Sequence, residues 1–206
     1  QATPPWMVLE EVRQLFHIES LQRDVDLIPT NVSVLLLIHP KDLPEQTLFA
    51  IDQFVLRGGK LLVFLDPHSE IDPGMGIGPG EFGEERVSDL EPLFKAWGLR
   101  LIPGKVLGDG SYALSVSMGQ GQRPARHAAW LALPQRAMNQ DDVATAGLES
   151  LNIATAGILE PGEGAKTQFV PLLQSSEYAM PLDAARFAML ANPEELMADI
   201  NPTGER

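Results

Sequence analysis

Residues 34–70 contain a complete strand–helix–strand pattern, which limits the possible folds of the chain more than any other feature. Residues 34–38 are all apolar, and this run is too short for a helix but typical of a strand covered on both faces. Residues 61–65 form a second apolar run of the same kind. Two neighbouring strands joined by a crossover helix run parallel with a right-handed connection, so the pattern predicts a parallel sheet.

The limits of the helix in this pattern are marked by residue types that start and stop helices. Asp42 stands three residues before Glu45, and this spacing predicts a capping box. Apolar residues then recur at helical spacing, and Arg57 followed by Gly58 is typical of a helix end. We therefore expect one amphipathic helix between the two strands.

Three polar side chains follow the two predicted strands. His39 comes after the first strand, and Asp66 and His68 follow the second. The carboxyl ends of neighbouring parallel strands lie side by side, and ligands of open α/β sheets usually bind at that edge. Three interpretations are open: the Asp66 carboxylate caps loop amides, the three residues bind a ligand, or they carry catalysis or a metal. We assign no catalytic residue and no metal ligand, and we keep His39, Asp66 and His68 as ligand-binding candidates.

The composition excludes several classes of ligand and chemistry. Fifteen Lys and Arg residues against 28 Asp and Glu give a net charge of −13, which repels nucleic acid and anionic bilayers. The chain has no cysteine, which excludes disulfides, thiolate catalysis and cysteine metal sites. No apolar run approaches the roughly 20 residues that a membrane-spanning helix needs.

Two glycine-rich stretches resemble phosphate-binding loops but lack the context that such loops need. Residues 74–80 alternate glycine with other residues, yet no helix follows directly, so we expect residues 71–85 to be a mobile loop. In residues 157–167, Glu163 holds the position of the P-loop lysine, which predicts a turn between strands. Neither stretch predicts a nucleotide site, so we expect no cofactor. The Gly-x-Ser-x-Gly motif of a nucleophilic serine does not occur either.

The remaining patterns are weaker. Ser88 and Glu91 have the spacing of a capping box, and the helix that they begin should end at Gly98. His17 and His127 are isolated in the sequence, so we interpret them as packing or surface residues. We also expect a helix over residues 6–16, an extended segment over 17–28, strands near 106–107, 129–133, 153–159 and 169–173, a helix over 139–151 and a final helix after Asn192.

The sequence LFAIDQFVLRGGKLLVFLDP, residues 48–67, closely resembles the extracytoplasmic domain of the gliding-motility-associated ABC transporter auxiliary proteins (GldG-like). Residues 5–7, 88–98 and 171–176 resemble the same family. The resemblance implies a domain outside the cytoplasmic membrane, in a parent protein held by hydrophobic anchors. It also implies the ABC permease and the ATPase of the same system as partners. The matching motifs are structural in character and name no chemistry.

These observations predict one α/β domain over residues 1–206. We expect a mainly parallel central sheet with helices on both faces, of the flavodoxin-like or Rossmann-like kind. Residues 1–110 should hold the strand–helix–strand units, and residues 111–206 should form a strand-rich C-terminal extension that completes or extends the sheet. The chain begins at Gln1 without a signal sequence and ends soon after a capped helix, so we expect it to come from a longer protein.

The expected function is non-catalytic. The resemblance implies an extracytoplasmic (periplasmic) auxiliary or substrate-binding domain of a gliding-motility-type ABC transport system. One alternative is an enzyme that uses Asp66, His68 and His39 on a small molecule, with or without a metal. Another is a module that binds a sugar or another small ligand. Trp97 is a candidate stacking residue for a sugar, although its place in an apolar helical stripe favours the core.

Overall fold

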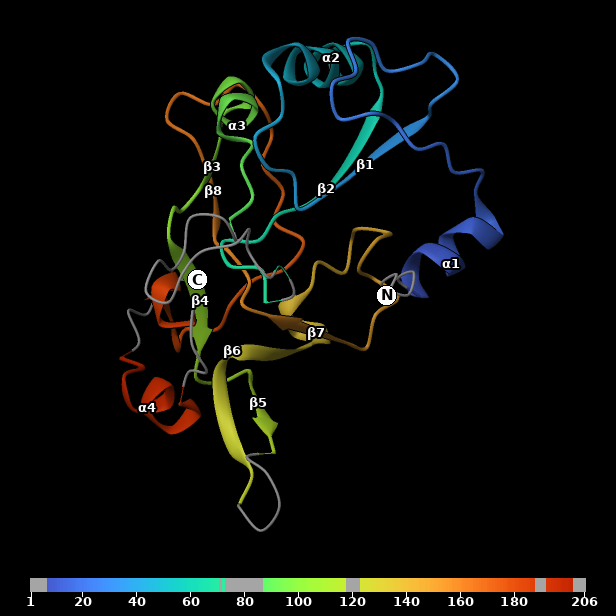
Figure 1. The fold of residues 1–206 in the computed structure, drawn as a ribbon. Helices are drawn as coiled ribbons and strands as arrows, with labels where there is room; N and C mark the ends of the chain where they lie inside the picture. Colours follow the sequence, from blue (N-terminus) through green and yellow to red (C-terminus); the bar gives the residue numbers. More distant parts are fainter. Residues whose placement is uncertain (1–6, 71, 73–86, 118–122, 188–191, 202–206) are drawn as a thin grey trace. The chain divides into compact units, whose positions relative to one another are not determined.

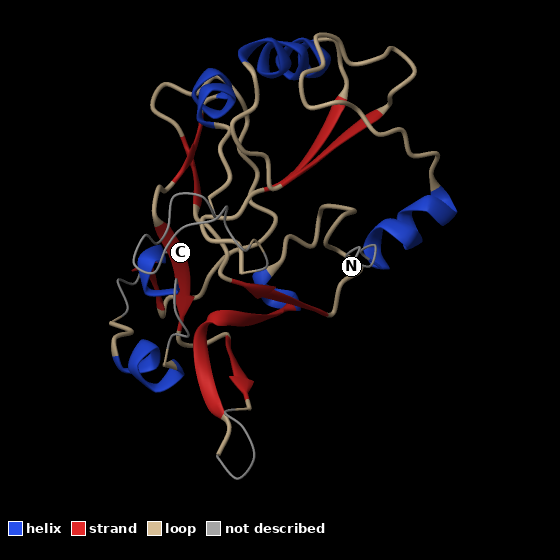
Figure 2. Ribbon diagram, viewed as in Figure 1, coloured by secondary structure: helices blue, strands red, loops and turns tan. Residues whose placement is uncertain are grey.

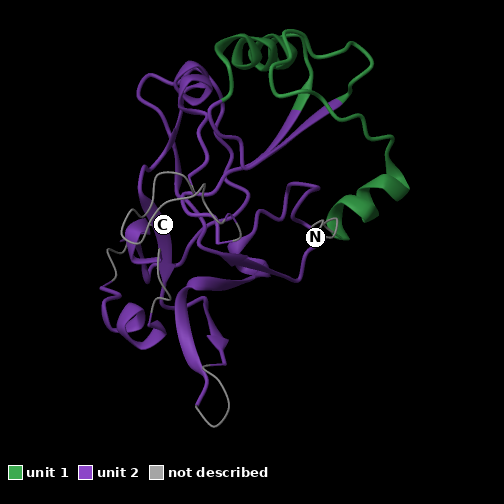
Figure 3. Ribbon diagram, viewed as in Figure 1, with its two compact units in different colours: residues 1–33, 43–60 green, residues 34–42, 61–206 purple. Residues whose placement is uncertain are grey.

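The computed structural model describes residues 7–70, 72, 87–117, 123–187 and 192–201. The chain divides into two compact units, which we describe separately. Unit 1 contains residues 1–33 and 43–60, and unit 2 contains residues 34–42 and 61–206 (Figure 3).

Short helices and short strands follow one another along the described chain (Figure 1). The α-helices are α1 (Met7–Leu15), α2 (Glu45–Leu56), α3 (Glu91–Trp97) and α4 (Pro193–Ala198), and two 3-10 helices are η2 (Gln135–Ala137) and η3 (Ala184–Phe187). The strands are β1 (Val34–Ile38), β2 (Lys60–Phe64), β3 (Leu99–Leu101), β4 (Lys105–Asp109), β5 (Ala113–Val116), β6 (Ala125–Pro134), β7 (Ser150–Ala154), β8 (Leu159–Pro161) and β9 (Ala179–Asp183).

The helix predicted after the first strand is α2, but its start differs from the prediction. Pro44 is the N-cap residue and no side chain caps the helix, so the predicted capping box of Asp42 and Glu45 is wrong. Asp42 has a left-handed backbone with φ of 45°, which keeps it outside the N-cap position. At the other end Gly58 has a φ of 93°, and this left-handed residue confirms the predicted stop.

The segment between α1 and β1 forms no strand, so the predicted extended segment over residues 17–28 is wrong. Side chains of α2 and of the residue after it bind backbone carbonyls of this segment. The Thr47 hydroxyl donates to the Arg23 carbonyl at 2.9 Å, and the Arg57 guanidinium donates to the Ile28 carbonyl. These side chains satisfy carbonyls that a strand would satisfy through a neighbouring strand.

Among the described helices, none is long and apolar enough to cross a membrane.

Strands β1 and β2 pair in the parallel direction that the sequence predicts. The Lys60 amide donates to the Ser33 carbonyl, and the His39 amide donates to the Phe64 carbonyl, so residue numbers rise together along both strands. This two-stranded sheet is the parallel part of the described structure. The helix α2 connects its two strands along the chain, as expected of a crossover.

The predicted mainly parallel central sheet of the flavodoxin-like or Rossmann-like kind is wrong. In the described residues, the other strands form small antiparallel sheets that pair β3 with β8, β4 with β9, and β6 with both β5 and β7 (Figure 2). The physical reason is the lack of crossover helices. Parallel neighbours need a long crossover connection, usually an α-helix, and the described residues contain no α-helix between β3 and β9. These strands therefore pair with antiparallel partners.

The core of unit 2 is built around the long strand β6. This strand contributes to each of three clusters of buried side chains, and β4, β9, α4 and the 3-10 helices η2 and η3 also contribute. The clusters are Tyr112, Leu131, Leu133 and Ala137; Val106, Ala129 and Ala184; and Ala128, Leu182 and Leu196. Because both faces of β6 are covered, the strand is apolar in a continuous run rather than in alternation.

Several elements of the second half differ from their sequence patterns. The predicted helix over residues 139–151 is wrong, because Asn139 and Asp142 accept hydrogen bonds from amides two residues ahead and form turns. The predicted strand over 169–173 is reduced to a single bridge between Leu173 and Met138. Strand β6 confirms and lengthens the predicted strand 129–133.

The predicted end of α3 and the predicted start of α4 are confirmed by capping geometry. Gly98 ends α3 with φ of 73°, and a Cβ there would lie 2.7 Å from the Ala165 Cβ. The Gly162 amide donates to the Gly98 carbonyl at 2.8 Å, so the turn after β8 packs on this helix end. At the start of α4, the Asn192 side chain accepts from the Glu194 amide at 3.0 Å, as the predicted final helix requires.

Candidate functional site

The ends of β1 and β2 bring His39 and Asp66 together, as expected for parallel neighbours. The His39 amide donates to the Phe64 carbonyl at 2.9 Å, so the pairing continues one residue beyond β1. The φ of His39 is 48°, a left-handed value that is uncommon for a residue other than glycine. His39 Nδ1 lies 3.8 Å from Asp66 Oδ2. Two of the three predicted candidates are therefore neighbours.

Ser88 links the two strand ends through both its hydroxyl and its backbone. The hydroxyl lies 2.8 Å from His39 Nδ1 and accepts a 2.8 Å hydrogen bond from the Asp66 amide. The Ser88 amide donates in turn to the Asp66 carbonyl at 2.9 Å. Since the hydroxyl accepts from Asp66, its single proton is available for His39 Nδ1. Ser88 is 5% exposed, so these bonds lie away from solvent.

The other ring nitrogen of His39 faces an ion pair. His39 Nε2 lies 3.0 Å from Asp72 Oδ2, and the Lys41 ammonium pairs with the same carboxylate oxygen. Both ring nitrogens of His39 therefore lie within hydrogen-bond distance of a polar side chain. The group therefore forms one connected chain of hydrogen bonds from Ser88 through His39 and Asp72 to Lys41, which we call the strand-end network.

The predicted capping box of Ser88 and Glu91 is wrong, and the strand-end network explains why. Leu90 is the N-cap residue of α3 and makes no side-chain capping bond. The Glu91 amide donates at 3.0 Å to Asp89 Oδ1, so the neighbouring aspartate serves the start of the helix. The Ser88 hydroxyl is occupied instead by the strand ends, through the Asp66 amide and the His39 ring.

The carboxyl group of Asp66 is partly buried beside the strand-end network. Burial raises the pKa of Asp66 above its ordinary value of 3.8, His39 and His68 act to lower it, and Glu70 acts to raise it. A raised pKa means that the folded state binds this proton more tightly than the unfolded state. The contribution of Asp66 to stability is therefore present at low pH and is lost as the pH rises through the folded pKa. Among the described residues, no backbone amide donates to the Asp66 carboxylate.

The third predicted candidate, His68, lies in a different environment. Its side chain is 4% exposed, and its ring centroid is 6.4 Å from that of Phe187. The Thr155 hydroxyl donates to the His68 carbonyl at 3.3 Å. The structure thus places His68 beside an aromatic ring, and it also lies near enough to Asp66 to act on the pKa of that carboxyl group.

His127 is 7% exposed and packs against other aromatic rings, which confirms the prediction of a packing residue. Its ring centroid lies 4.9 Å from that of Trp130 and 6.3 Å from that of Phe187. The Ala129 amide donates to His127 Nδ1 at 3.3 Å, and the Trp130 indole donates to Glu70 at 2.8 Å. Burial lowers the pKa of His127 below 6.5, although Glu70 acts to raise it.

The order serine–histidine–aspartate in the strand-end network is also the order of a nucleophilic triad. A nucleophile must reach its substrate, whereas the Ser88 hydroxyl is buried and accepts a hydrogen bond from a backbone amide. In the described ranges, no group of three or more His, Cys, Asp or Glu side chains has the arrangement of a metal site. The contacts are those of a structural link between strand ends.

Sequence reasoning missed three members of the network. Lys41 lies two residues after His39, but Ser88 and Asp72 lie far along the chain and follow no recognised motif. The predicted mobile loop over residues 71–85 lies outside the described residues except for Asp72. A pattern that pairs the end of a strand with the start of a later helix would have been needed to find Ser88.

The lowered pKa of His127 predicts a pH dependence of stability. The unfolded chain protonates this histidine near pH 6.5, whereas the folded chain resists protonation because the ring is buried. The stabilisation by His127 is therefore complete above the unfolded pKa and lost as the pH falls. His127→Phe keeps an aromatic ring but cannot titrate. We subtract the free energy of unfolding of His127→Phe, measured in urea, from that of the wild type. This difference should decrease as the pH is lowered from about 7.5 to 5. A difference that does not change with pH would show that His127 binds its proton equally well in the folded and unfolded states.

The family model for an ABC-type uncharacterized transport system, ABC_transp_aux, matches residues 1–206. No curated protein and no solved structure matches the chain. The match covers the strand-end network together with both compact units. The suspected resemblance to transporter auxiliary proteins is confirmed at the level of this family. The chain therefore belongs to the family of auxiliary components of ABC-type transport systems.

Proposed function

We propose that this chain is the extracytoplasmic domain of a membrane-anchored auxiliary protein, of the gliding-motility type, that docks on the permease of its ABC transport system. Membership of the transporter auxiliary family supports a role beside a permease and its ATPase. The proposed role is non-catalytic, because the polar groups at the strand ends are used to link backbone segments.

The observation that carries the proposal is an exposed apolar face on the parallel sheet. The hydrogen bonds between the strands align Val34 with Lys60, and Leu36 with Leu62. The alternation of side chains then places Val34, Leu36, Leu62 and Phe64 on one face, which we call the β1–β2 face. These four residues are 52%, 37%, 49% and 55% exposed, respectively.

An exposed apolar face is unusual for a parallel sheet. Parallel strands are normally covered on both faces, whereas antiparallel sheets often leave one face in water. Contiguous exposed apolar side chains commonly mark a protein–protein or membrane contact. The net charge of −13 disfavours contact with an anionic bilayer, so an apolar segment of a permease subunit is the proposed partner of the β1–β2 face.

The enzyme alternative has one observation in its favour, which is the serine–histidine–aspartate order in the strand-end network. We do not adopt it, because the Ser88 hydroxyl is buried and already bonded to the Asp66 amide. The sugar-binding alternative relied on Trp97, which is the last residue of α3. The Trp97 carbonyl accepts from the Thr167 hydroxyl at 2.6 Å, so a neighbouring turn contacts this end of the helix. We do not adopt this alternative.

Site-specific photo-cross-linking tests the docking surface. A photoreactive phenylalanine at position 62 or 64 of the membrane-anchored parent should capture a permease subunit in membranes that contain the transport system. The control is the same residue at position 143, where Val143 is 97% exposed and lies outside the β1–β2 face. Equal capture from position 143, or capture of no permease subunit from positions 62 and 64, would contradict the docking role of this face.

Single-cysteine labelling tests the proposed location. The chain has no cysteine, so Val143→Cys gives this domain one reactive thiol at a highly exposed position. In the anchored parent, freed of other cysteines, a membrane-impermeant maleimide should label this thiol in spheroplasts without detergent. Labelling that appears only after the membrane has been permeabilised would place the domain on the cytoplasmic side and overturn the proposed location.

A further inference from the structure

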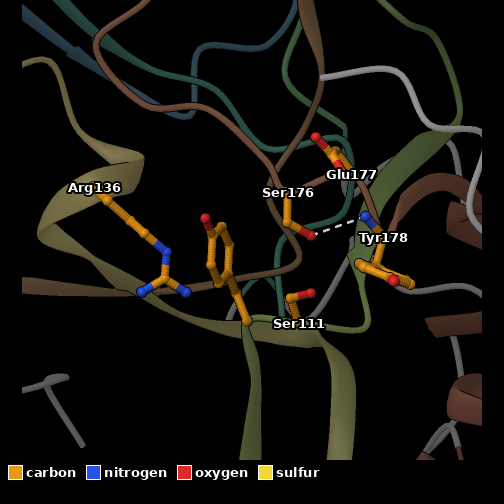
Figure 4. A pocket seen from close by; sticks show the side chains of 6 residues that line it. Ser111, Arg136, Ser176, Glu177 and Tyr178 are labelled. Carbon is orange, nitrogen blue, oxygen red and sulfur yellow. Dashed lines mark hydrogen bonds between the residues drawn. The ribbon is translucent and has the colours of Figure 1, made fainter.

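A hollow of about 300 Å³ lies in unit 2 beside the turn between β4 and β5 (Figure 4). Its volume is at the lower end of the range for small-molecule sites. Three segments meet around it: the turn before β5, the 3-10 helix η2 and the residues that lead into β9. The lining residues are Ser111, Tyr112, Arg136, Ser176, Glu177 and Tyr178.

Two walls of the hollow are fixed by one buried carboxylate. Asp109 is 0% exposed, and its carboxylate accepts from the Ser111 amide at 2.8 Å and the Tyr112 amide at 3.1 Å. The same carboxylate accepts from the Ser176 amide and the Ser176 hydroxyl, both at 2.7 Å. The Ser176 hydroxyl also accepts from the Tyr178 amide at 3.0 Å. These bonds hold the turn and the β9 segment in place, so the hollow is formed before any ligand binds.

The third wall supplies a guanidinium group. Arg136 projects from η2 and lies over the Tyr112 ring, with 5.5 Å between its central carbon and the ring centroid. In Figure 4 the Arg136 side chain lies on the opposite side of the hollow from Ser111 and Ser176. Within the described part of the chain, Arg136 makes no hydrogen bond or ion pair, although the protein has 28 acidic residues against 15 basic ones.

We propose that this hollow binds a small organic monocarboxylate, with Arg136 as its anchor. A guanidinium has a planar fork of donors that matches a carboxylate with two parallel hydrogen bonds. The rings of Tyr112 and Tyr178 offer apolar walls for the rest of the ligand, and the Ser111 hydroxyl offers a neutral donor. Glu177 also lines the hollow, and its negative charge disfavours a dianion such as phosphate more than a monoanion.

The proposal is independent of docking at the β1–β2 face, because it concerns binding by the 206-residue chain alone. The probe is benzoate, which joins a carboxylate to an aromatic ring, and the matched neutral probe is benzamide. Inorganic phosphate tests whether the hollow takes any anion. Binding is followed by amide shifts in the NMR spectrum of the isotope-labelled chain.

Benzoate should bind saturably and shift the amides of Ser111 and of residues 176–178, and benzamide should not. Arg136→Gln should weaken benzoate binding roughly tenfold or more, because a charge-assisted pair of hydrogen bonds is lost. Arg136→Lys keeps the charge without the fork and should bind with intermediate affinity. The matched control is Arg100→Gln, since Arg100 pairs with Glu160 on another sheet and carries the same change of charge.

Four results would overturn the proposal: no saturable binding of benzoate, equal binding of benzamide, tighter binding of phosphate, or an equal loss in Arg136→Gln and Arg100→Gln. Failure of the cross-linking experiment would leave this result unaffected, since no permease is present in the titration.

Discussion

The Ser88 hydroxyl is the contact on which the arrangement around the parallel strands depends. It accepts from the Asp66 amide after β2 and lies 2.8 Å from the ring of His39 at the end of β1, so one buried group joins both strand ends to the start of α3. A buried backbone amide without a partner costs about 1–3 kcal/mol. The hydroxyl therefore stabilises the edge of the sheet where ligands of larger α/β folds usually bind. In this chain, that edge is used to hold the fold, and the exposed apolar surface lies on the face of the sheet.

Local sequence patterns predicted the parts of the structure that depend on neighbouring residues. The apolar runs became β1 and β2, a helix connects them along the chain, and Gly58 and Gly98 stop their helices in left-handed conformations. The pairing of parallel strands also predicted correctly that His39 and Asp66 would be neighbours. These predictions succeeded because the spacing of apolar residues, the residues that end a helix and the direction of two strands joined by a helix depend on residues close together in the chain.

Long-range partners could not be predicted from the same patterns. The spacing of Ser88 and Glu91 is that of a capping box, yet the hydroxyl serves strand ends that are distant in sequence. The position of His68 after a strand predicted a ligand-binding candidate. Its ring is instead buried near Phe187, which comes from the last part of the chain. The prediction of a mainly parallel sheet is wrong for a related reason. An apolar run predicts a buried strand but does not identify its partner, and the described residues contain no crossover helix between β3 and β9.

A double-mutant cycle between Ser88 and His39 tests most directly whether the strand-end network is a structural link. The free energies of unfolding of wild type, Ser88→Ala, His39→Ala and the double variant are measured in urea. If the two side chains act through one hydrogen bond, their coupling energy should be about 0.5–3 kcal/mol. The control cycle pairs His39→Ala with Ser115→Ala on β5, where the serine is exposed and the effects should add. Additive losses in the Ser88 cycle, equal to those in the control, would contradict the link.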